Sequence, residues 1–159
     1  MPSPPLLDPS TLDTGRVLLG PEKIRAVNPQ RFEMEMLSGI LRYSGDDPLC
    51  VGFKDLRLDD FWTRGHLPGR PLLPGVLMIE AAAQLAGFLS AMRAPPPAGR
   101  FWGFGGLDAV RFRGVVVPPC RLFVAASLSA LRSTIAVCDA QAFVGAKMVF
   151  EGRVLGALV

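Results

Sequence analysis

The stretch GHLPGRPLLPGVLMIEAAAQ, residues 65–84, decides how this chain can fold. Its first half is so rich in proline and glycine that we expect an ordered but irregular loop over residues 60–75. From Gly75 onward the chain is apolar on nearly every side until APPPAG interrupts it at residues 94–99. This pattern predicts one long helix over residues 75–92, buried in the centre of a domain.

A helix this apolar also has to be weighed as a membrane span. Its polar side chains are Glu80, Gln84 and Ser90. A carboxylate near the middle of a span is costly in lipid, and Pro74 interrupts the apolar run near one end. The sequence therefore favours a core helix without membrane insertion.

Strand-like segments lie on both sides of this helix. Residues 31–43 and 49–58 precede it and are separated by the turn sequence SGDDP. Antiparallel strands around a helix that is apolar all round predict a curved sheet wrapped about that helix, which is an α+β architecture. Four more strand-like segments follow the helix, at residues 101–113, 121–131, 133–144 and 146–157.

The chain divides into an arm and one domain. Residues 1–28 are expected to form an amino-terminal arm with short helical segments, one of them opened by Pro21, and residues 29–159 to form the domain. The first nine residues hold four prolines and lack the charged start and apolar run of a signal peptide. We therefore expect these residues to be a loose arm.

Composition limits the classes of function. Hydrophobic residues make up 50% of the chain, which is high for a small soluble monomer and predicts burial of surface against further copies. The net charge of +3 suits an acidic protein partner but is too weak and too little clustered for nucleic-acid binding. The cysteines have no metal-ligand spacing, so we expect no metal site and reduced thiols in a cytoplasmic protein at Cys50, Cys120 and Cys138.

His66 and Glu80 are the candidate catalytic residues. A lone histidine is often structural, but His66 stands in the rigid loop that leads into the helix, and imidazole is the readiest general base near neutral pH. The alternative is that Glu80 is a structural carboxylate that faces solvent. Its neighbours one helical turn away, however, provide neither a polar face exposed to solvent nor a basic partner. Burial favours the neutral carboxylic acid, which can donate a proton. Gln84, one turn further on, is the nearby polar side chain that can hold it.

The start of the helix supplies a third element. The N–H groups of Gly75 and Val76 suit a carbonyl oxygen that becomes an enolate, and the missing Cβ of Gly75 lets a substrate approach the backbone closely. Taken alone, Gly75 is equally a simple loop glycine. Together, a base, an oxyanion-holding helix end and an acid predict removal of water next to an activated carbonyl. Nucleophile elbows, phosphate-binding loops and dinucleotide fingerprints are missing from the sequence.

The same stretch resembles the GHFPGxPxxPGVLxxEAxAQ signature of 3-hydroxyacyl-[acyl-carrier-protein] dehydratases of the FabZ type. In that family the histidine and glutamate of the signature are catalytic, and they match His66 and Glu80 at the same spacing. Glutamate rather than aspartate at the second position is typical of this branch and not of the FabA-type dehydratase/isomerase. Weaker similarity extends over about residues 29–157, where PQRFEMEM resembles the family's PHRFPFLL and FGGLDAVRFRGVVVPPC resembles its FAGIDEARFKRPVVPGD.

The resemblance implies a hot-dog fold and a cytoplasmic lyase. It would convert (3R)-3-hydroxyacyl thioesters on acyl carrier protein to trans-2-enoyl thioesters, in fatty acid biosynthesis or a related branch of lipid metabolism, without metal or organic cofactor. It also implies a homodimer with continuous sheets, in which His66 of one subunit faces Glu80 of the other. Further assembly into a trimer of dimers is common among such relatives.

Other positions follow from the resemblance. Leu67, Pro68 and Gln84 would line or support the acyl tunnel. Arg111 and Arg113 would contact the carrier protein, although pairing with Asp108 or with solvent explains them equally well. This chain departs from the family pattern at the acyl tunnel, at the first strand and at a turn, through Leu67, Gln30, Glu33 and the sequence Pro118, Pro119 and Cys120.

Two alternatives remain open from the sequence. A hot-dog thioesterase places a carboxylate to activate water and does not need the histidine loop, so GHLPGRP argues against it. A non-catalytic acyl-binding subunit of a heteromeric hot-dog complex would fit the departures at Gln30, Glu33 and Pro119.

Overall fold

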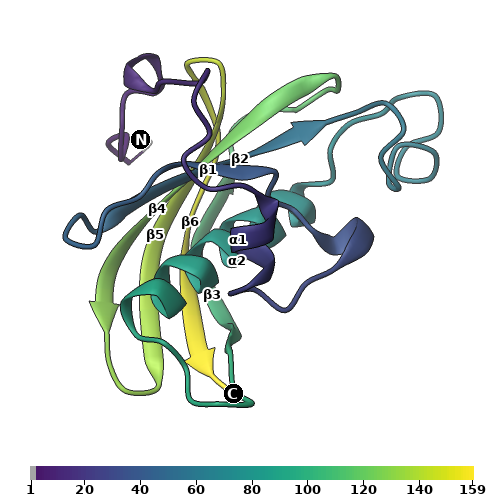
Figure 1. Cartoon of the computed structure of the whole chain (residues 1–159). Helices are drawn as coiled ribbons and strands as arrows, with labels where there is room; N and C mark the ends of the chain where they lie inside the picture. The colour runs from purple at the N-terminus through teal and green to yellow at the C-terminus, as the bar shows by residue number, and fades with distance from the viewer. Residues whose placement is uncertain (1–2) are drawn as a thin grey trace.

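A single antiparallel sheet of six strands dominates the computed structural model, which describes residues 3–159 (Figure 1). The order across the sheet is β1-β2-β4-β5-β6-β3, so β1 and β3 are its edges. The strands in chain order are β1 Gly39–Arg42, β2 Leu49–Leu56, β3 Trp102–Phe112, β4 Cys120–Leu131, β5 Ile135–Val144 and β6 Lys147–Leu158.

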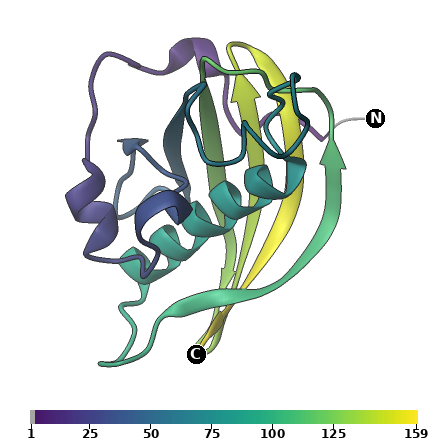
Figure 2. The ribbon, with the colours of Figure 1, turned by 90° about the vertical axis from the view of Figure 1, so that its right-hand side faces the viewer.

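The long helix α2, Gly75–Arg93, lies along the concave face of this sheet, which curves around it (Figure 2). The short helix α1, Pro21–Arg25, lies on the side of α2 that faces away from the sheet. The helix and the four strands after it confirm the sequence-based expectation to within a few residues, and the α+β hot-dog architecture is confirmed with them.

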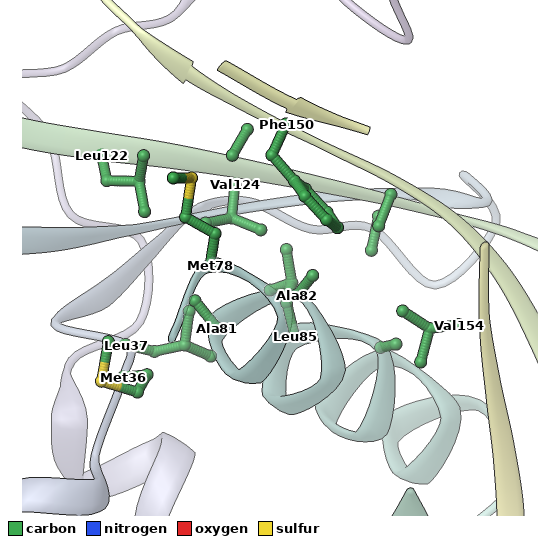
Figure 3. Packing of buried hydrophobic residues seen from close by; sticks show 14 of the residues in the cluster. Met36, Leu37, Met78, Ala81, Ala82, Leu85, Leu122, Val124, Phe150 and Val154 are labelled. Atoms are coloured by element: carbon green, nitrogen blue, oxygen red, sulfur yellow. The ribbon is translucent and has the colours of Figure 1, made fainter. Parts of the chain in front are cut away.

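Packing of α2 against the sheet forms the core (Figure 3). Ala81 and Ala82 are fully buried and small, so the helix can approach the strands closely, while Leu85 fills the space between them. Each large apolar side chain buried this way stabilises the fold by roughly 1.5–3 kcal/mol. By length and composition α2 would also pass for a membrane span, but more than half of its residues are buried inside the domain. The strand side chains that meet α2 include Leu122, Val124 and Phe150.

The strand expected over residues 31–43 is wrong for its first part. Only Gly39–Arg42 pairs with β2, and Phe32–Met34 forms a short 3-10 helix, η2. The cause is a side chain from α2: Gln84 Nε2 donates to the Met34 carbonyl at 2.6 Å, and the Met36 N–H donates to Gln84 Oε1 at 2.9 Å. These backbone groups are satisfied by the helix and so need no neighbouring strand.

The amino-terminal arm is not loose over its described part. It lies on the outer face of the sheet, where Gln141 of β5 accepts a hydrogen bond from the Leu6 N–H at 2.7 Å and donates to the Pro4 carbonyl at 2.9 Å. Leu7 is buried in a second apolar cluster with Val51 and Phe143. Strand alternation turns these two side chains away from α2, which gives the arm an apolar surface to cover.

The three cysteines are free thiols, as expected. Cys50 and Cys138 are buried, and burial raises the pKa of each thiol to about 12. Burial also raises the pKa of the half-buried Cys120 thiol. All three are therefore protonated at neutral pH and serve as small apolar side chains.

Glu151 of β6 makes the stability of the fold depend on pH. It is only 6% exposed, and burial opposes its ionisation, but Arg113 and the Ser3 N–H donate to it and hold its pKa below the usual range. A carboxylate of this kind stabilises the fold above its unfolded-state pKa and loses that contribution as the pH falls.

We expect Glu151→Gln to lower the free energy of unfolding at pH 7 by about 1–3 kcal/mol, because Arg113 loses a charged partner. Its unfolding free energy should also fall less steeply than that of the wild type below about pH 4.5, the ordinary carboxyl value. Urea denaturation across a pH series measures both effects. Asp139→Asn, which breaks the exposed pair with Arg153, is the control and should change stability by less than about 1 kcal/mol. Equal pH slopes for wild type and Glu151→Gln would contradict this account.

Candidate active site

Glu80 lies on α2, on the side that faces the loop after α1 and the beginning of β3. Its side chain is half-buried, so the enclosure expected from its apolar neighbours is incomplete in the single chain. Gln84 Nε2 donates to Glu80 Oε1 at 2.7 Å, one helical turn apart, which is the contact anticipated from the sequence. This bond orients one carboxylate oxygen and leaves the other free to meet a substrate.

Gln84 connects Glu80 to the neighbouring backbone through hydrogen bonds. It is only 4% exposed, and besides Glu80 its side chain bonds the backbone of Met34 and Met36. Asn28 adds a further bond from its Nδ2 to the Gln84 carbonyl at 2.9 Å. The carboxyl group of Glu80 is therefore held by a network that includes the segment before β1. The sequence did not lead us to predict Asn28, although a polar residue between Val27 and Pro29 could have indicated a structural hydrogen bond.

A hollow of about 80 Å³ opens beside Glu80. Its walls come from residues 27–30, from the face of α2 that carries Glu80, Ala83 and Gly87, and from the beginning of β3. The exposed side chain of Phe104 lies at the β3 wall, at the edge of the sheet. Beyond this wall the hollow is open, because β3 is an edge strand and has no neighbour on its outer side within residues 3–159.

His66 lies in the irregular loop before α2, and the loop is anchored at both ends. The Trp62 side chain is buried and its carbonyl accepts from the His66 N–H at 2.9 Å, while the Leu73 N–H donates to the Val116 carbonyl at 2.8 Å. The His66 side chain is exposed, and no hydrogen bond within residues 3–159 joins it to Glu80. The structure thus places the two candidate catalytic residues in separate surroundings of one chain.

The first turn of α2 offers two backbone donors. Neither Gly75 N–H nor Val76 N–H donates to a backbone carbonyl in the described residues, and no side chain caps this helix end. The Val76 side chain is 67% exposed. Both N–H groups and the helix dipole are therefore available to an oxygen that gains negative charge.

The structure gives a packing reason for glycine at position 75 that the sequence did not reveal. A Cβ built there would meet the Phe112 ring of β3 at 2.9 Å. The missing Cβ therefore makes room for an aromatic side chain of the same chain. Phe112 also contacts Phe150 of the core, with ring centroids 6.0 Å apart, so it links the helix start to the sheet.

The remaining predicted residues lie at the surface. Leu67 and Pro68 are exposed in the His66 loop. Arg111 is exposed, with Nη1 donating to the neighbouring Val110 carbonyl at 2.7 Å. Arg113 pairs instead with Glu151, so Arg111 has the freer guanidinium group. Residues 3–159 contain no group of three or more histidine, cysteine, aspartate or glutamate side chains that could hold a metal ion.

Gly75→Ala should lower the free energy of unfolding by about 1–3 kcal/mol, because the new methyl group overlaps the Phe112 ring. In a Phe112→Ala background the same change should be neutral or stabilising, since alanine is the better helix former. Gly87→Ala on the same helix is the control, because its Cβ would meet only the Trp102 carbonyl at 3.4 Å. Denaturant unfolding of the double-mutant cycle measures the coupling, and additive effects would contradict it.

Gln84→Leu should destabilise the fold by about 1–3 kcal/mol for each buried backbone group that it leaves unpaired. Amide hydrogen exchange provides the specific measurement, because the Met36 N–H loses its acceptor and should exchange faster. Ser90→Ala is the matched control on α2: its Oγ donates to the Ala86 carbonyl at 2.7 Å, so its loss leaves no backbone N–H unpaired. Unchanged exchange at Met36 in Gln84→Leu would be the contrary result.

The chain matches one family model and is similar in sequence to several known proteins. Residues 28–153 match the model of the FabA-like domain. The chain is similar to a protein from Pelotomaculum thermopropionicum named 3-hydroxyacyl-[acyl-carrier-protein] dehydratase FabZ, with 34% identity over 89% of this chain and 99% of the relative. The protein of the same name from Clostridioides difficile is 32% identical over the same shares.

Solved structures share the architecture at lower identity. A dehydratase heterocomplex from Xenorhabdus doucetiae superimposes with a TM-score of 0.70 and 18% identity, covering 91% of this chain and 93% of the other. A mutant thioesterase from Pseudomonas aeruginosa gives a TM-score of 0.66 with 16% identity, covering 91% and 96%. At such identity the likeness concerns the fold alone, which hosts more than one reaction.

Proposed function

Because this chain belongs to the FabA-like family, as a dehydratase of the FabZ type, we propose that it removes water from (3R)-3-hydroxyacyl thioesters on acyl carrier protein. The product is the trans-2-enoyl thioester, and the setting is fatty acid biosynthesis in the cytoplasm. The observation that carries this proposal is the arrangement within residues 66–80: a histidine, an uncapped helix start and a glutamate held by Gln84. The thioesterase and the non-catalytic subunit considered above find no support in these relatives, which are named dehydratases.

Each of these groups has one task in the reaction. His66 takes the proton from C2, and the Gly75 and Val76 N–H groups bind the thioester oxygen as it gains charge. The electron pair forms the C2–C3 double bond while the C3 hydroxyl leaves with a proton from Glu80. The proton on His66 then returns to the Glu80 carboxylate, which restores both groups. No metal or organic cofactor takes part in these steps.

The proposal requires two chains for each site. Within residues 3–159 His66 is exposed and makes no hydrogen bond with Glu80, and the beginning of the edge strand β3 forms one wall of the hollow beside Glu80. The side chains of Phe104 and Leu107 are exposed along that edge. Two copies that pair their β3 strands would continue the sheet and cover these side chains. His66 of one subunit would then complete the site of the other, and such dimers would associate further as trimers of dimers.

The carrier protein is the proposed macromolecular partner. Its acyl-pantetheine group would enter beside the His66 loop, where Leu67 and Pro68 become tunnel walls once a second copy covers them. Arg111 is the exposed cation placed to meet an acidic carrier, and the net charge of +3 favours the encounter.

Activity of mixed variants tests the shared site. His66→Ala and Glu80→Gln should each lose about 10²–10⁴-fold in dehydration rate, the usual contribution of a positioned acid or base. After the two inactive variants are unfolded together and refolded, about a quarter of the wild-type activity should return, because each mixed dimer holds one intact site. The measurement is formation of enoyl thioester from 3-hydroxyacyl carrier protein.

The controls separate the chemistry from the assembly. Refolding each variant alone should restore nothing, and mixing His66→Ala with a His66→Ala/Glu80→Gln double variant should restore nothing either. If a correctly folded single variant dehydrates at the wild-type rate, the catalytic assignment fails. If the single variants are inactive and their refolded mixture is inactive as well, the sites are not shared between subunits.

A further inference from the structure

Phe32 is an exposed aromatic side chain on a strained backbone. Its φ angle is 58°, in the left-handed region that bulky residues rarely adopt, and the residue is 85% exposed. Strain of this kind persists only where the surrounding structure enforces it, and it is concentrated at functional sites. The fold therefore holds this ring out in solvent at a cost in free energy, and contacts inside residues 3–159 do little to offset it.

The backbone on both sides of Phe32 is fixed. Before the ring, Arg31 Nη2 donates to the Arg25 carbonyl at 2.9 Å. After it, Glu35 pairs with the Arg25 guanidinium group at 2.7 Å, and its carbonyl accepts from Lys54 Nζ at 2.8 Å. Because these bonds tie the segment to α1 and to β2, the backbone of Phe32 is held in its strained conformation and the ring stays in place.

The 3-10 helix η2, which begins at Phe32, lies beside Glu80. Gln84 Nε2 donates both to Glu80 Oε1 at 2.7 Å and to the Met34 carbonyl at 2.6 Å, so one nitrogen joins the carboxylate to η2. A base and an acid that act on adjacent carbons of one substrate have to lie close together. A histidine that reaches this acid from a second copy therefore brings its loop up to η2.

The loop before α2 carries exposed groups that match those of η2. Leu67 directly follows the candidate base and is 41% exposed, and Arg64 and Arg70 are exposed on either side of it. On η2, Glu33 is an exposed carboxylate next to the apolar ring of Phe32. None of these three charged side chains forms an ion pair within residues 3–159. The two surfaces are complementary in both charge and apolar character.

We propose that η2 is the docking surface for the His66 loop of a second copy, with Phe32 packed against Leu67 of that loop and the η2 carboxylate facing its two arginines. Phe32 is then a positioning residue, which acts through His66 of the second copy and sets its distance from Glu80. This inference rests on the proposed function with its shared sites and names the contact that aligns them. A ring that is already fixed before association loses little further freedom when it is covered, which gives the strain a purpose.

Mixed dimers in which the two chains differ test this contact. In a dimer of a His66→Ala chain with a Glu80→Gln chain, the one intact site takes Glu80 from the first chain and His66 from the second. Phe32→Asn in the first chain should lower kcat for dehydration about 10²-fold, the effect of a reacting group displaced by about 1 Å. The same substitution in the second chain should leave the rate unchanged, because it then lies at the site that is already inactive.

The choice of variant separates loss of the ring from loss of the fold. Asparagine tolerates a left-handed backbone, so Phe32→Asn removes the ring without forcing the segment to refold. Phe32→Tyr keeps the ring and should retain the rate in either chain. Two different affinity tags isolate the mixed dimer, and rates are expressed per mixed dimer together with its circular dichroism spectrum.

The outcomes distinguish this inference from the proposed function. Loss of rate only when the substitution is in the chain that supplies Glu80 is the expected result. Loss only from the chain that supplies His66 shows that Phe32 supports its own loop, and equal rates in the two placements show no role in docking; either result overturns the inference. If the mixed dimer without a Phe32 substitution is inactive while the wild type dehydrates its substrate, the shared site fails and the docking with it. An inactive wild type refutes the dehydratase proposal itself.

Discussion

A helix that is apolar on every side has no stable place in water until it is covered on every side. In this protein α2 is covered on one side by a sheet that curves around it and on another by α1 and the segment that follows. Both the small side chains Ala81 and Ala82 and the curvature of the sheet serve this enclosure. Of its polar side chains, Gln84 and Ser90 are buried while Glu80 stays half-buried, and the candidate active site lies where Glu80 interrupts the apolar surface.

Gln84 fixes the orientation of the Glu80 side chain. A single buried amide bonds the Glu80 carboxyl group and two backbone groups before β1, so the orientation of Glu80 and the local fold depend on the same side chain. This sharing explains why residues 31–36 leave the extended conformation. It also ties the loop that carries Gln30 to the helix, because Asn28 bonds the Gln84 carbonyl.

The edge strand β3 is the part of the fold on which the proposed dimer depends. Its exposed apolar side chains and the hollow beside Glu80 lie at this edge of the sheet, and the His66 loop is exposed as well. Phe112 packs against Gly75, so the edge strand and the start of α2 are in direct contact. In the proposed dimer, pairing of two such edges covers this apolar surface.

The sequence by itself determined the long helix, the strands after it, the spacing of His66 and Glu80 and the family, because each depends on patterns within a few tens of residues. It also identified Gln84 as the partner of Glu80, since the two are one helical turn apart. Other features were decided only in three dimensions: the bend at Met34 and Met36, the docking of the arm on Gln141, the pairing of Arg113 with Glu151 and the packing of Phe112 on Gly75. In each of these the partner lies roughly forty to well over a hundred positions away, and no local pattern reports which distant group will satisfy a buried donor or fill a space.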